Sequence, residues 1–395
     1  MSSFAHMENL EEKACLCALN RIFGFRPEIG TALISHLGSG SEVFRLGRRS
    51  LEKMLGRDSR HLELISPDAV RDACRELKSL EGSGTRFIGW NDPAYPSLLK
   101  ECPDAPVGLY IKSLTPPEKL WNTSGSIAVV GTRDISPYGR EWCIRTVSVL
   151  ASSDKKPLII SGLALGTDIC AHRTALEYGL PTIAVMATGP DSIYPFRHRD
   201  FAERLWKTEG CALVTDYPPG TAPLGLHFLR RNRIIAGLSE AVILIESKIK
   251  GGGMNTARLA FSYSRDVYAL PGRADDIRSQ GCNRLIREKI AEPLVSTEDL
   301  LESLGMRSAA GKRKASAVEI LRERFNGRTS PEDLASMSSI IEAIRKERGI
   351  TLEEISHATG IDYHRTARIA GILELEGLIC IDLLQRCTLE AKIFR

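Results

Sequence analysis

Residues suited to binding phosphate gather between His227 and Arg258. A basic stretch, LRRNR (229–233), precedes the apolar segment Ala241–Ile245, and three glycines then open a segment with helical character. Guanidinium groups and the consecutive N–H groups of a helix N-terminus both stabilise the spread-out negative charge of a phosphate. We therefore expect a nucleic-acid site here. The candidate ligands are Phe228, Arg230, Arg231, Asn232, Arg233, Lys248, Lys250, Gly251, Gly252, Gly253 and Thr256.

Two further loops are candidates for the same site. GTRDISPYG (131–139) and SGLALGTDICAH (161–172) each follow a short apolar run. Their candidate ligands are Arg133, Ser161, Gly162 and Gly166. LRRNR and GGGMNT (251–256) are the third and fourth candidate loops. Four strand ends then supply one crevice, and the hypothesis is an acid-free hollow for a polyanionic strand. With five phosphates neutralised, binding to a single strand would show a log-log salt slope of about −3.5.

Each of these residues also has a purely structural interpretation. Asp168 is more typical of a helix N-cap than of a catalytic acid, and His172 of a packed side chain than of a base. Neighbouring residues on a helix diverge by about 100°, so at least one of the three arginines in LRRNR is expected to be structural. Phe228 fits either a core position or a base-stacking position, and the triple glycine fits either a flexible turn or a close approach to a ligand.

The elements that would position these residues alternate between strand and helix from Ser126 onward. Apolar runs of four or five residues with crossover helices between them predict a parallel sheet covered on both faces. Ligands of such a Rossmann-like domain are expected at the carboxyl ends of the strands. The expected strands are 127–130, 158–160, 182–186, 211–214, 241–245 and 267–270, and the expected helices are 137–151, 169–178, 198–206 and one from Asn255.

The whole chain of 395 residues reads as an α/β protein with flanking modules. The pattern of residues 1–81 predicts a small helical domain that resembles a SAM or helix-hairpin-helix bundle. Two roles are considered for it: a structural or protein-contact role, and phosphate binding. Residues 82–304 predict the extended Rossmann-like domain, whose segment 82–121 pads one edge, and 305–330 a basic linker.

Residues 331–395 predict a winged helix. Helices are expected over 338–348, 352–359 and 363–376, followed by a hairpin of 378–384 and 386–389. The module carries 8 Lys and Arg against 11 Asp and Glu. Because a helix that enters a major groove usually belongs to a basic face, this balance favours a protein contact over duplex binding.

Composition and missing motifs exclude several classes of protein. The ten cysteines include no C-x-x-C pair, which argues against zinc and against a disulfide framework. No stretch is apolar enough to span a membrane, so a cytoplasmic protein without membrane contact is expected. The first strand is not followed by G-x-G-x-x-G, and no Walker A motif is present. We expect no cofactor, no metal ion and no catalytic residue.

A set of motifs in a fixed order resembles the DNA-processing protein A (DprA, or Smf) family. The matching segments are Tyr95-Pro96 with Leu98-Leu99, VVGTR (129–133), SGLALGTDICAH, YP (194–195), DYPPGT (216–221), FLRRNRIIAGLS (228–239), GGGMNTA (251–257), ALPG (269–272) and GCNRLI (281–286). The resemblance implies a non-enzymatic, dimeric binder of single-stranded DNA that loads the recombinase RecA during natural transformation. It assigns DNA contacts to Arg133, to Phe228 with residues 231–233, and to the glycine loop.

Three departures from that family affect individual contacts. Many members carry a basic residue where this chain has Gly225, proline where it has Leu229, and serines in the glycine loop. Two other hypotheses compete. A related nucleotide phosphoribohydrolase is disfavoured because Asn255 and Leu259 replace the glycine and glutamate of its signature. A protein scaffold without DNA binding is the other.

Overall fold

The computed structural model describes residues 2–121, 123–307, 321, 324–325, 329–347, 349–382 and 385–389. They divide into two compact units, Met1–Ser308 and Ala309–Arg395. The basic residues Lys312, Arg313 and Lys314 of the expected linker lie outside the described residues.

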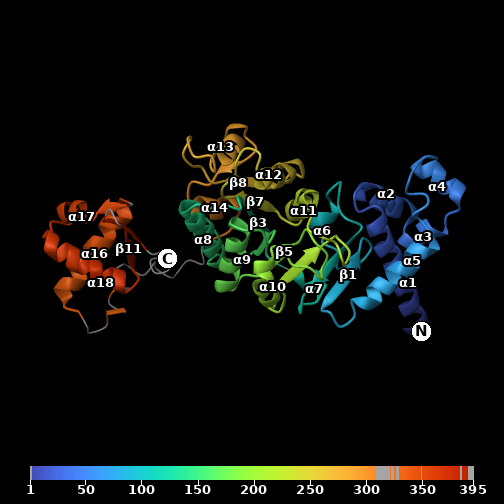
Figure 1. The fold of residues 1–395 in the computed structure, drawn as a ribbon, viewed down its shortest axis with the longest axis horizontal. Coiled ribbons are helices and arrows are strands. Elements are labelled where there is room, and N and C mark those ends of the chain that lie inside the picture. The colour runs from blue at the N-terminus through green and yellow to red at the C-terminus, as the bar shows by residue number, and fades with distance from the viewer. Residues whose placement is uncertain are drawn as a thin grey trace. The chain divides into compact units, whose positions relative to one another are not determined.

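Five helices form the N-terminal part of the first unit, as expected for residues 9–81 (Figure 1). They are α1 (Ser2–Ile22), α2 (Pro27–Leu37), α3 (Gly40–Arg45), α4 (Arg48–Leu55) and α5 (Pro67–Ser79). Ser39 and Ser66 cap α3 and α5 by accepting backbone N–H groups. The apolar core of this bundle also contains Phe87, Val107 and Tyr110 from the neighbouring segment, so the helices pack directly on the edge of a sheet.

That sheet has nine strands in the order β1-β2-β6-β5-β4-β3-β7-β8-β9. Strands β3 to β9 run parallel, while β1 pairs antiparallel with β2, and β2 with β6. The prediction of a mostly parallel sheet with residues 82–121 at one edge is confirmed. The strands are β1 (Thr85–Gly89), β2 (Gly108–Lys112), β3 (Ser126–Val130), β4 (Leu158–Ser161), β5 (Thr182–Val185), β6 (Ala212–Thr215), β7 (Ala241–Leu244), β8 (Asp266–Ala269) and β9 (Glu292–Pro293).

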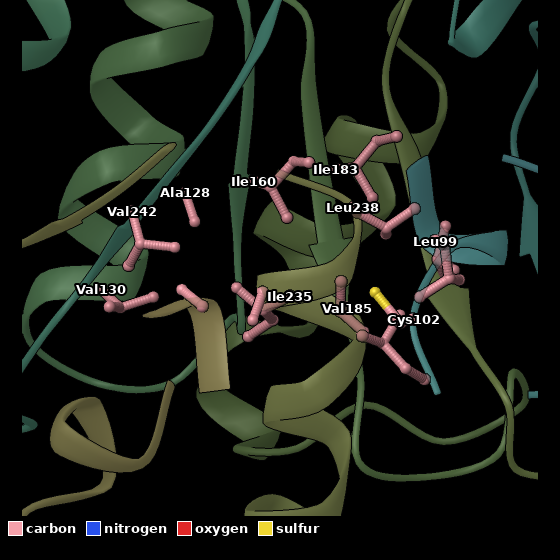
Figure 2. Packing of buried hydrophobic residues seen from close by; sticks show 14 of the residues in the cluster. Leu99, Cys102, Ala128, Val130, Ile160, Ile183, Val185, Ile235, Leu238 and Val242 are labelled. Carbon is pink, nitrogen blue, oxygen red and sulfur yellow. The ribbon is translucent and has the colours of Figure 1, made fainter. Parts of the chain in front are cut away.

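Helices cover both faces of the sheet because alternate residues of each strand point to opposite faces. One face packs against α6 (Ser97–Lys100), α7 (Pro117–Leu120), α11 (Gly225–Gly237), α12 (Gly252–Ser262) and α13 (Gln280–Arg287). The other packs against α8 (Pro137–Ala151), α9 (Thr167–Glu177), α10 (Arg199–Trp206), which follows the short 3₁₀ turn Phe196–His198, and α14 (Thr297–Ser303). Figure 2 shows Ile235 of α11 and the neighbouring Leu238 among Val130, Ile160 and Val185 of the strands.

The order of the strands reverses between β3 and β7. The chain passes from β3 outward through β4, β5 and β6, then returns to build β7, β8 and β9 on the other side of β3. In open α/β sheets, ligands bind in the crevice that such a reversal leaves at the carboxyl ends of the strands. The fold therefore predicts a site at the ends of β3 and β7.

Two local predictions were wrong. Residues 229–233 do not form a loop but lie inside α11, where Ile234, Ile235 and Ala236 are buried against the sheet. Helix α12 begins at Gly252 rather than at Asn255, so the second and third glycines form its first turn.

The second unit has the expected winged-helix arrangement. Its helices are α16 (Pro331–Lys346), α17 (Leu352–Thr359) and α18 (Tyr363–Leu375), and its sheet has the order β10 (Ile350–Thr351), β12 (Arg386–Leu389), β11 (Ile379–Ile381). The first helix begins earlier than predicted because Ser330 caps it and Pro331 occupies its first turn.

Across the described ranges, no helix combines the length and apolar character needed to cross a membrane. The same residues contain no cluster of three or more His, Cys, Asp or Glu side chains that could hold a metal ion.

Candidate nucleic-acid interface

A hollow of about 610 Å³ lies at the ends of β3 and β7, where the topology places a ligand site. Nine of the residues predicted from the sequence line it: Arg133, Phe228, Arg231, Asn232, Lys248, Gly251, Gly252, Gly253 and Thr256. The structure places the other predicted residues away from this lining: Ser161, Gly162, Gly166, Arg230, Arg233 and Lys250.

An arginine and two aromatic rings stand together in this lining. The Arg133 guanidinium carbon lies 5.0 Å from the centre of the Phe228 ring, within the range of a cation–π contact. The Tyr194 ring also contacts Phe228, with its centre 5.4 Å from that of the Phe228 ring in an edge-on arrangement. Arg133 and Tyr194 are exposed and Phe228 is half-buried. This arrangement offers π faces and a cation to an entering ligand.

Buried contacts hold the loop that carries Arg133. Glu246, which follows β7 and is 1% exposed, accepts hydrogen bonds from the Ser136 backbone N–H at 2.9 Å and from the Ser136 hydroxyl at 2.5 Å. A Cβ at Gly131 would lie 2.5 Å from Thr167 Oγ1, so only glycine fits there. The Asp134 carboxylate beside Arg133 is paired with Arg278 at 2.9 Å. The loop therefore presents its cation from a fixed backbone, with its acid neutralised.

Arg231 is buried in the floor of the hollow. Its guanidinium donates hydrogen bonds to the carbonyl of Gly162 at 2.6 Å and to the carbonyl of Val185. Burial lowers the pKa of this arginine to about 10, while the charge of Asp168 acts to raise it. Arg231 thus ties α11 to the ends of β4 and β5, and only part of its hydrogen-bonding capacity is available to a ligand.

Asp168 lines the same floor, so the expectation of an acid-free hollow was wrong. It is also not a helix cap: Gly166 occupies the N-cap of α9, and the Asp168 carboxylate accepts the N–H of Ala164 at 3.3 Å. Burial raises the pKa of this carboxyl, and the charge of Arg231 opposes the shift. The pair gives the floor a nearly balanced charge, whereas the unpaired cations lie at the rim.

The other two arginines of α11 serve structural contacts. Arg230 donates to the carbonyls of Gly24 and Phe25, and its guanidinium carbon lies 4.4 Å from the centre of the Phe25 ring. Arg233 is buried and forms an ion pair with Asp216 at 2.5 Å. The three arginines point in three directions, as helical geometry requires.

The glycine segment brings backbone close to the hollow. Gly251 is the N-cap of α12 and donates its N–H to the Lys248 carbonyl at 2.8 Å. The N–H groups of Gly252 and Gly253 belong to the first turn, where a helix supplies no acceptor of its own. The Asn232 side chain donates to the Gly252 carbonyl at 3.3 Å. Lys248 lines the hollow and is exposed, so amides and one ammonium group meet at this rim.

Two polar residues of the 161–172 segment face the interior instead. The Ser161 hydroxyl donates to the Val129 carbonyl at 2.7 Å. The His172 ring is buried, with Nδ1 2.8 Å from the Thr182 hydroxyl, and burial lowers the pKa of His172 to about 3. His172 is therefore a packed, hydrogen-bonded side chain that stays neutral near pH 7, as its structural interpretation predicts.

Tyr194 and Gly225 also line the hollow, although the sequence reasoning did not propose either residue as a ligand. Tyr194 stands in the stretch YPFRHR (194–199), which combines aromatic and basic residues. That combination is typical of single-strand binders and was the available signal.

Comparisons with known proteins give a consistent result. Residues 86–305 match the model of the family described as DNA recombination-mediator protein A. The chain is 35% identical over 264 residues to Protein Smf of Synechocystis sp., covering 67% of this chain and 63% of that protein, so it spans less than two thirds of that relative. It is 38% identical over 210 residues to DNA processing protein DprA of Streptococcus pneumoniae, covering 53% of this chain and 71% of that one. The X-ray structure of the pneumococcal protein aligns with a TM-score of 0.54 and 31% identity over 66% of this chain and 92% of that chain.

Proposed function

Because the chain belongs to the DNA recombination-mediator protein A family, we propose that it is a non-enzymatic binder of single-stranded DNA. It binds with little sequence preference, as a homodimer formed through the Rossmann-like domain. It acts as a recombination mediator that loads a RecA recombinase onto DNA taken up in natural transformation.

One observation carries the proposal. The exposed guanidinium of Arg133 lies over Phe228 beside Tyr194 in the lining of a hollow at the switch point of the sheet. Aromatic rings stack on any nucleobase and guanidinium groups pair with any phosphate, so the combination suits a strand of arbitrary sequence. Lys248 and the first-turn amides of α12 add phosphate ligands in the same lining.

The burial of two arginines lowers the expected electrostatic contribution. Arg231 and Arg233 are engaged inside the protein and Lys250 lies outside the lining, which leaves Arg133 and Lys248 as the exposed cations of the hollow. Two neutralised phosphates correspond to a log-log salt slope of about −1.4 for a single strand, instead of the −3.5 expected from five.

Fluorescence anisotropy with a labelled oligothymidylate, measured across a salt series, tests the proposal. We expect Arg133→Ala to weaken binding about tenfold or more and to make the slope less steep by about 0.7. The matched control is Arg287→Ala, because Arg287 is also exposed but lies on α13 outside the lining of the hollow. A flat salt response, or equal affinity of the two variants, would contradict the proposal.

The partner and the assembly need separate measurements. Sedimentation at several concentrations is expected to show a dimer. RecA filament formation on a strand coated with single-strand-binding protein is expected to be faster with the wild type than with Arg133→Ala. A monomer at all concentrations would contradict the homodimer alone. RecA filament formation that the protein does not accelerate would contradict the mediator role alone.

The phosphoribohydrolase hypothesis makes an opposite prediction. The Leu259 side chain packs partly buried against the apolar core, where the related enzymes would carry a glutamate. We expect no base to be released from nucleoside monophosphates, and measurable release would favour the enzyme.

A further inference from the structure

The stretch Tyr194–Arg199 begins in the proposed site with Tyr194 and continues beyond it. Its sequence, YPFRHR, combines two aromatic residues with two arginines on either side of His198. Phe196 is 74% exposed and Tyr194 is 45% exposed. An aromatic side chain that leaves most of its surface in water loses the stabilisation that burial would give, so such exposure is informative when it occurs beside a binding site.

This exposed segment is firmly anchored. The His198 ring between its arginines is buried, and Nδ1 of that ring donates to the Leu163 carbonyl at 2.9 Å. Leu163 belongs to the loop after β4, next to Ala164 in the lining of the hollow. Phe201 and Leu205 of the following helix α10 are buried in the same apolar cluster as Leu163. These contacts attach the segment to the loop after β4, beside the hollow. Phe196 is thus held in place while remaining exposed.

Three exposed guanidinium groups lie on or beside this segment. Arg197 and Arg199 are exposed, and the Arg199 guanidinium carbon lies 5.9 Å from the centre of the Phe196 ring. Arg173 of α9 is also exposed, and its guanidinium carbon lies 5.8 Å from the centre of the ring of Phe201, in the helix that follows the segment.

These charges are not neutralised within the protein. Among the described residues, no ion pair joins Arg173, Arg197 or Arg199 to a carboxylate. The nearby Glu203 is occupied by Lys207 at 2.7 Å. Asp191, before the segment, accepts the N–H of Gly220 at 3.0 Å.

The segment is continuous with the hollow. Tyr194 lines the hollow with its ring 5.4 Å from Phe228, and Phe196 follows two residues later. We propose that Tyr194–Arg199 and Arg173 form a second contact surface for the same DNA strand, in which Phe196 stacks on a base outside the hollow. Arg173, Arg197 and Arg199 neutralise the phosphates on either side of that base. This inference rests on the proposed binding of single-stranded DNA at the hollow.

A DNA strand accounts for both features of this surface. Every nucleotide presents a π face and one negative charge, which matches a surface of aromatic and cationic side chains. A strand that leaves the hollow past Tyr194 meets Phe196 two residues further along the segment.

Two lengths of oligonucleotide separate the inference from the proposed function. An oligothymidylate of roughly three nucleotides reaches the hollow only, and one of roughly fifteen reaches both surfaces. We expect Phe196→Ala to weaken binding of the long oligonucleotide by about fivefold or more and to leave the short one unchanged. The double variant Arg197→Ala/Arg199→Ala should make the salt slope for the long oligonucleotide less steep by about 1.4.

Phe261→Ala is the matched control, because Phe261 is 52% exposed and lies at the far end of α12 from the glycine segment. If Phe196→Ala and Phe261→Ala bind the long oligonucleotide equally, the second surface is refuted. The Arg133→Ala variant then shows whether such a result affects the second surface alone or DNA binding at the hollow as well. If Arg133→Ala still weakens both lengths, only the inference fails, whereas a wild type that binds neither length refutes the proposed function with it. Unchanged melting temperatures of the variants show that folding is not the cause.

Discussion

Arg133 and Arg231 line the same hollow but have different surroundings. Arg133 is exposed and contacts an aromatic face, whereas Arg231 is 3% exposed and bonds two carbonyl groups beside Asp168. A buried arginine beside a buried acid contributes to the fold before it contributes to binding. Loss of DNA binding on replacing Arg231 would not by itself identify a ligand contact.

Replacing Arg231 with alanine is expected to destabilise the protein by about 3–5 kcal/mol, since it leaves the Asp168 carboxylate buried without its cation. Replacing Arg133 with alanine should change the unfolding free energy by no more than about 0.5 kcal/mol, as at other exposed positions. Urea unfolding followed by circular dichroism measures both. Equal stabilities of the two variants would show that Arg231 is not a structural cross-link.

His172 makes stability dependent on pH. Its pKa is about 3 in the folded protein against the ordinary value of 6.5, so the unfolded chain binds the proton more tightly. Stability from this ring is complete above pH 6.5 and is lost as the pH falls toward 3. Between pH 7 and pH 5 the loss is about 2 kcal/mol.

In His172→Leu, the difference in unfolding free energy between pH 7 and pH 5 should shrink by about that amount. Urea titrations at the two pH values give the comparison. Parallel pH dependences of variant and wild type would mean that another group controls acid sensitivity.

At the scale of elements, the first turn of α12 is closely constrained by packing at one of its two glycines. A Cβ on Gly253 would lie 2.6 Å from the Leu244 side chain and 3.2 Å from Gly131 Cα, whereas a Cβ on Gly252 meets nothing within 4 Å. The two adjacent glycines therefore offer a matched pair.

Gly253→Ala is expected to push α12 away from β3 and weaken DNA binding, with a stability loss of about 1–3 kcal/mol from overpacking. Gly252→Ala should keep both properties close to wild type and so serves as the control. Thermal melts and anisotropy measure the two effects. If both variants bind equally well, the close approach of this turn to β3 is not needed for the site.

Gly225, the first residue of α11, lines the hollow and has open space around its Cα. Many members of the family carry a basic residue at this position. Gly225→Lys is expected to tighten binding of single-stranded DNA and to steepen the salt slope by about 0.7, because one more phosphate is neutralised.

Gly225→Gln controls for the added side chain without its charge. Equal affinities of the lysine and glutamine variants would place the strand away from the N-terminus of α11.

Local sequence patterns predicted most of these elements but not the partners of their polar residues. Short apolar runs identified β3 to β8, since burial on both faces requires them. Residues 229–233 were assigned to a loop because four polar side chains in a row conceal the helical period. Their partners, such as Asp216 for Arg233 and the Phe25 carbonyl for Arg230, lie 17 and 205 residues away along the chain. No pattern within a short window contains that information.

At the scale of the whole molecule, the described lining of the hollow lies entirely within the first unit. In the second unit, Arg365 and Arg368 of α18 are occupied by Glu332 and Asp333 of α16, with distances of 2.9 to 3.2 Å. A helix whose cations are paired with acids of its own module does not present the basic face that binding in a DNA groove requires.

A chain ending at Ser316, which keeps the basic residues 312–314, should bind single-stranded DNA within about a factor of two of the full chain, since the described lining of the hollow belongs to the first unit alone. Duplex competitor should displace neither form. A tenfold loss on truncation, or effective competition by duplex only with the full chain, would assign DNA binding to the winged helix.

The buried amide of Asn20 illustrates what it means for the helical bundle and the sheet to share an interior. Its side chain donates to the Asp216 carbonyl at 2.8 Å and accepts the N–H of Gly108 at 3.1 Å, while Arg230 grips the turn after the same helix. The sequence pattern changes at residue 81, but the buried contacts do not stop there. The helical bundle therefore could not be exchanged for another at this boundary. A transplanted bundle would therefore have to supply its own replacement for each of these bonds.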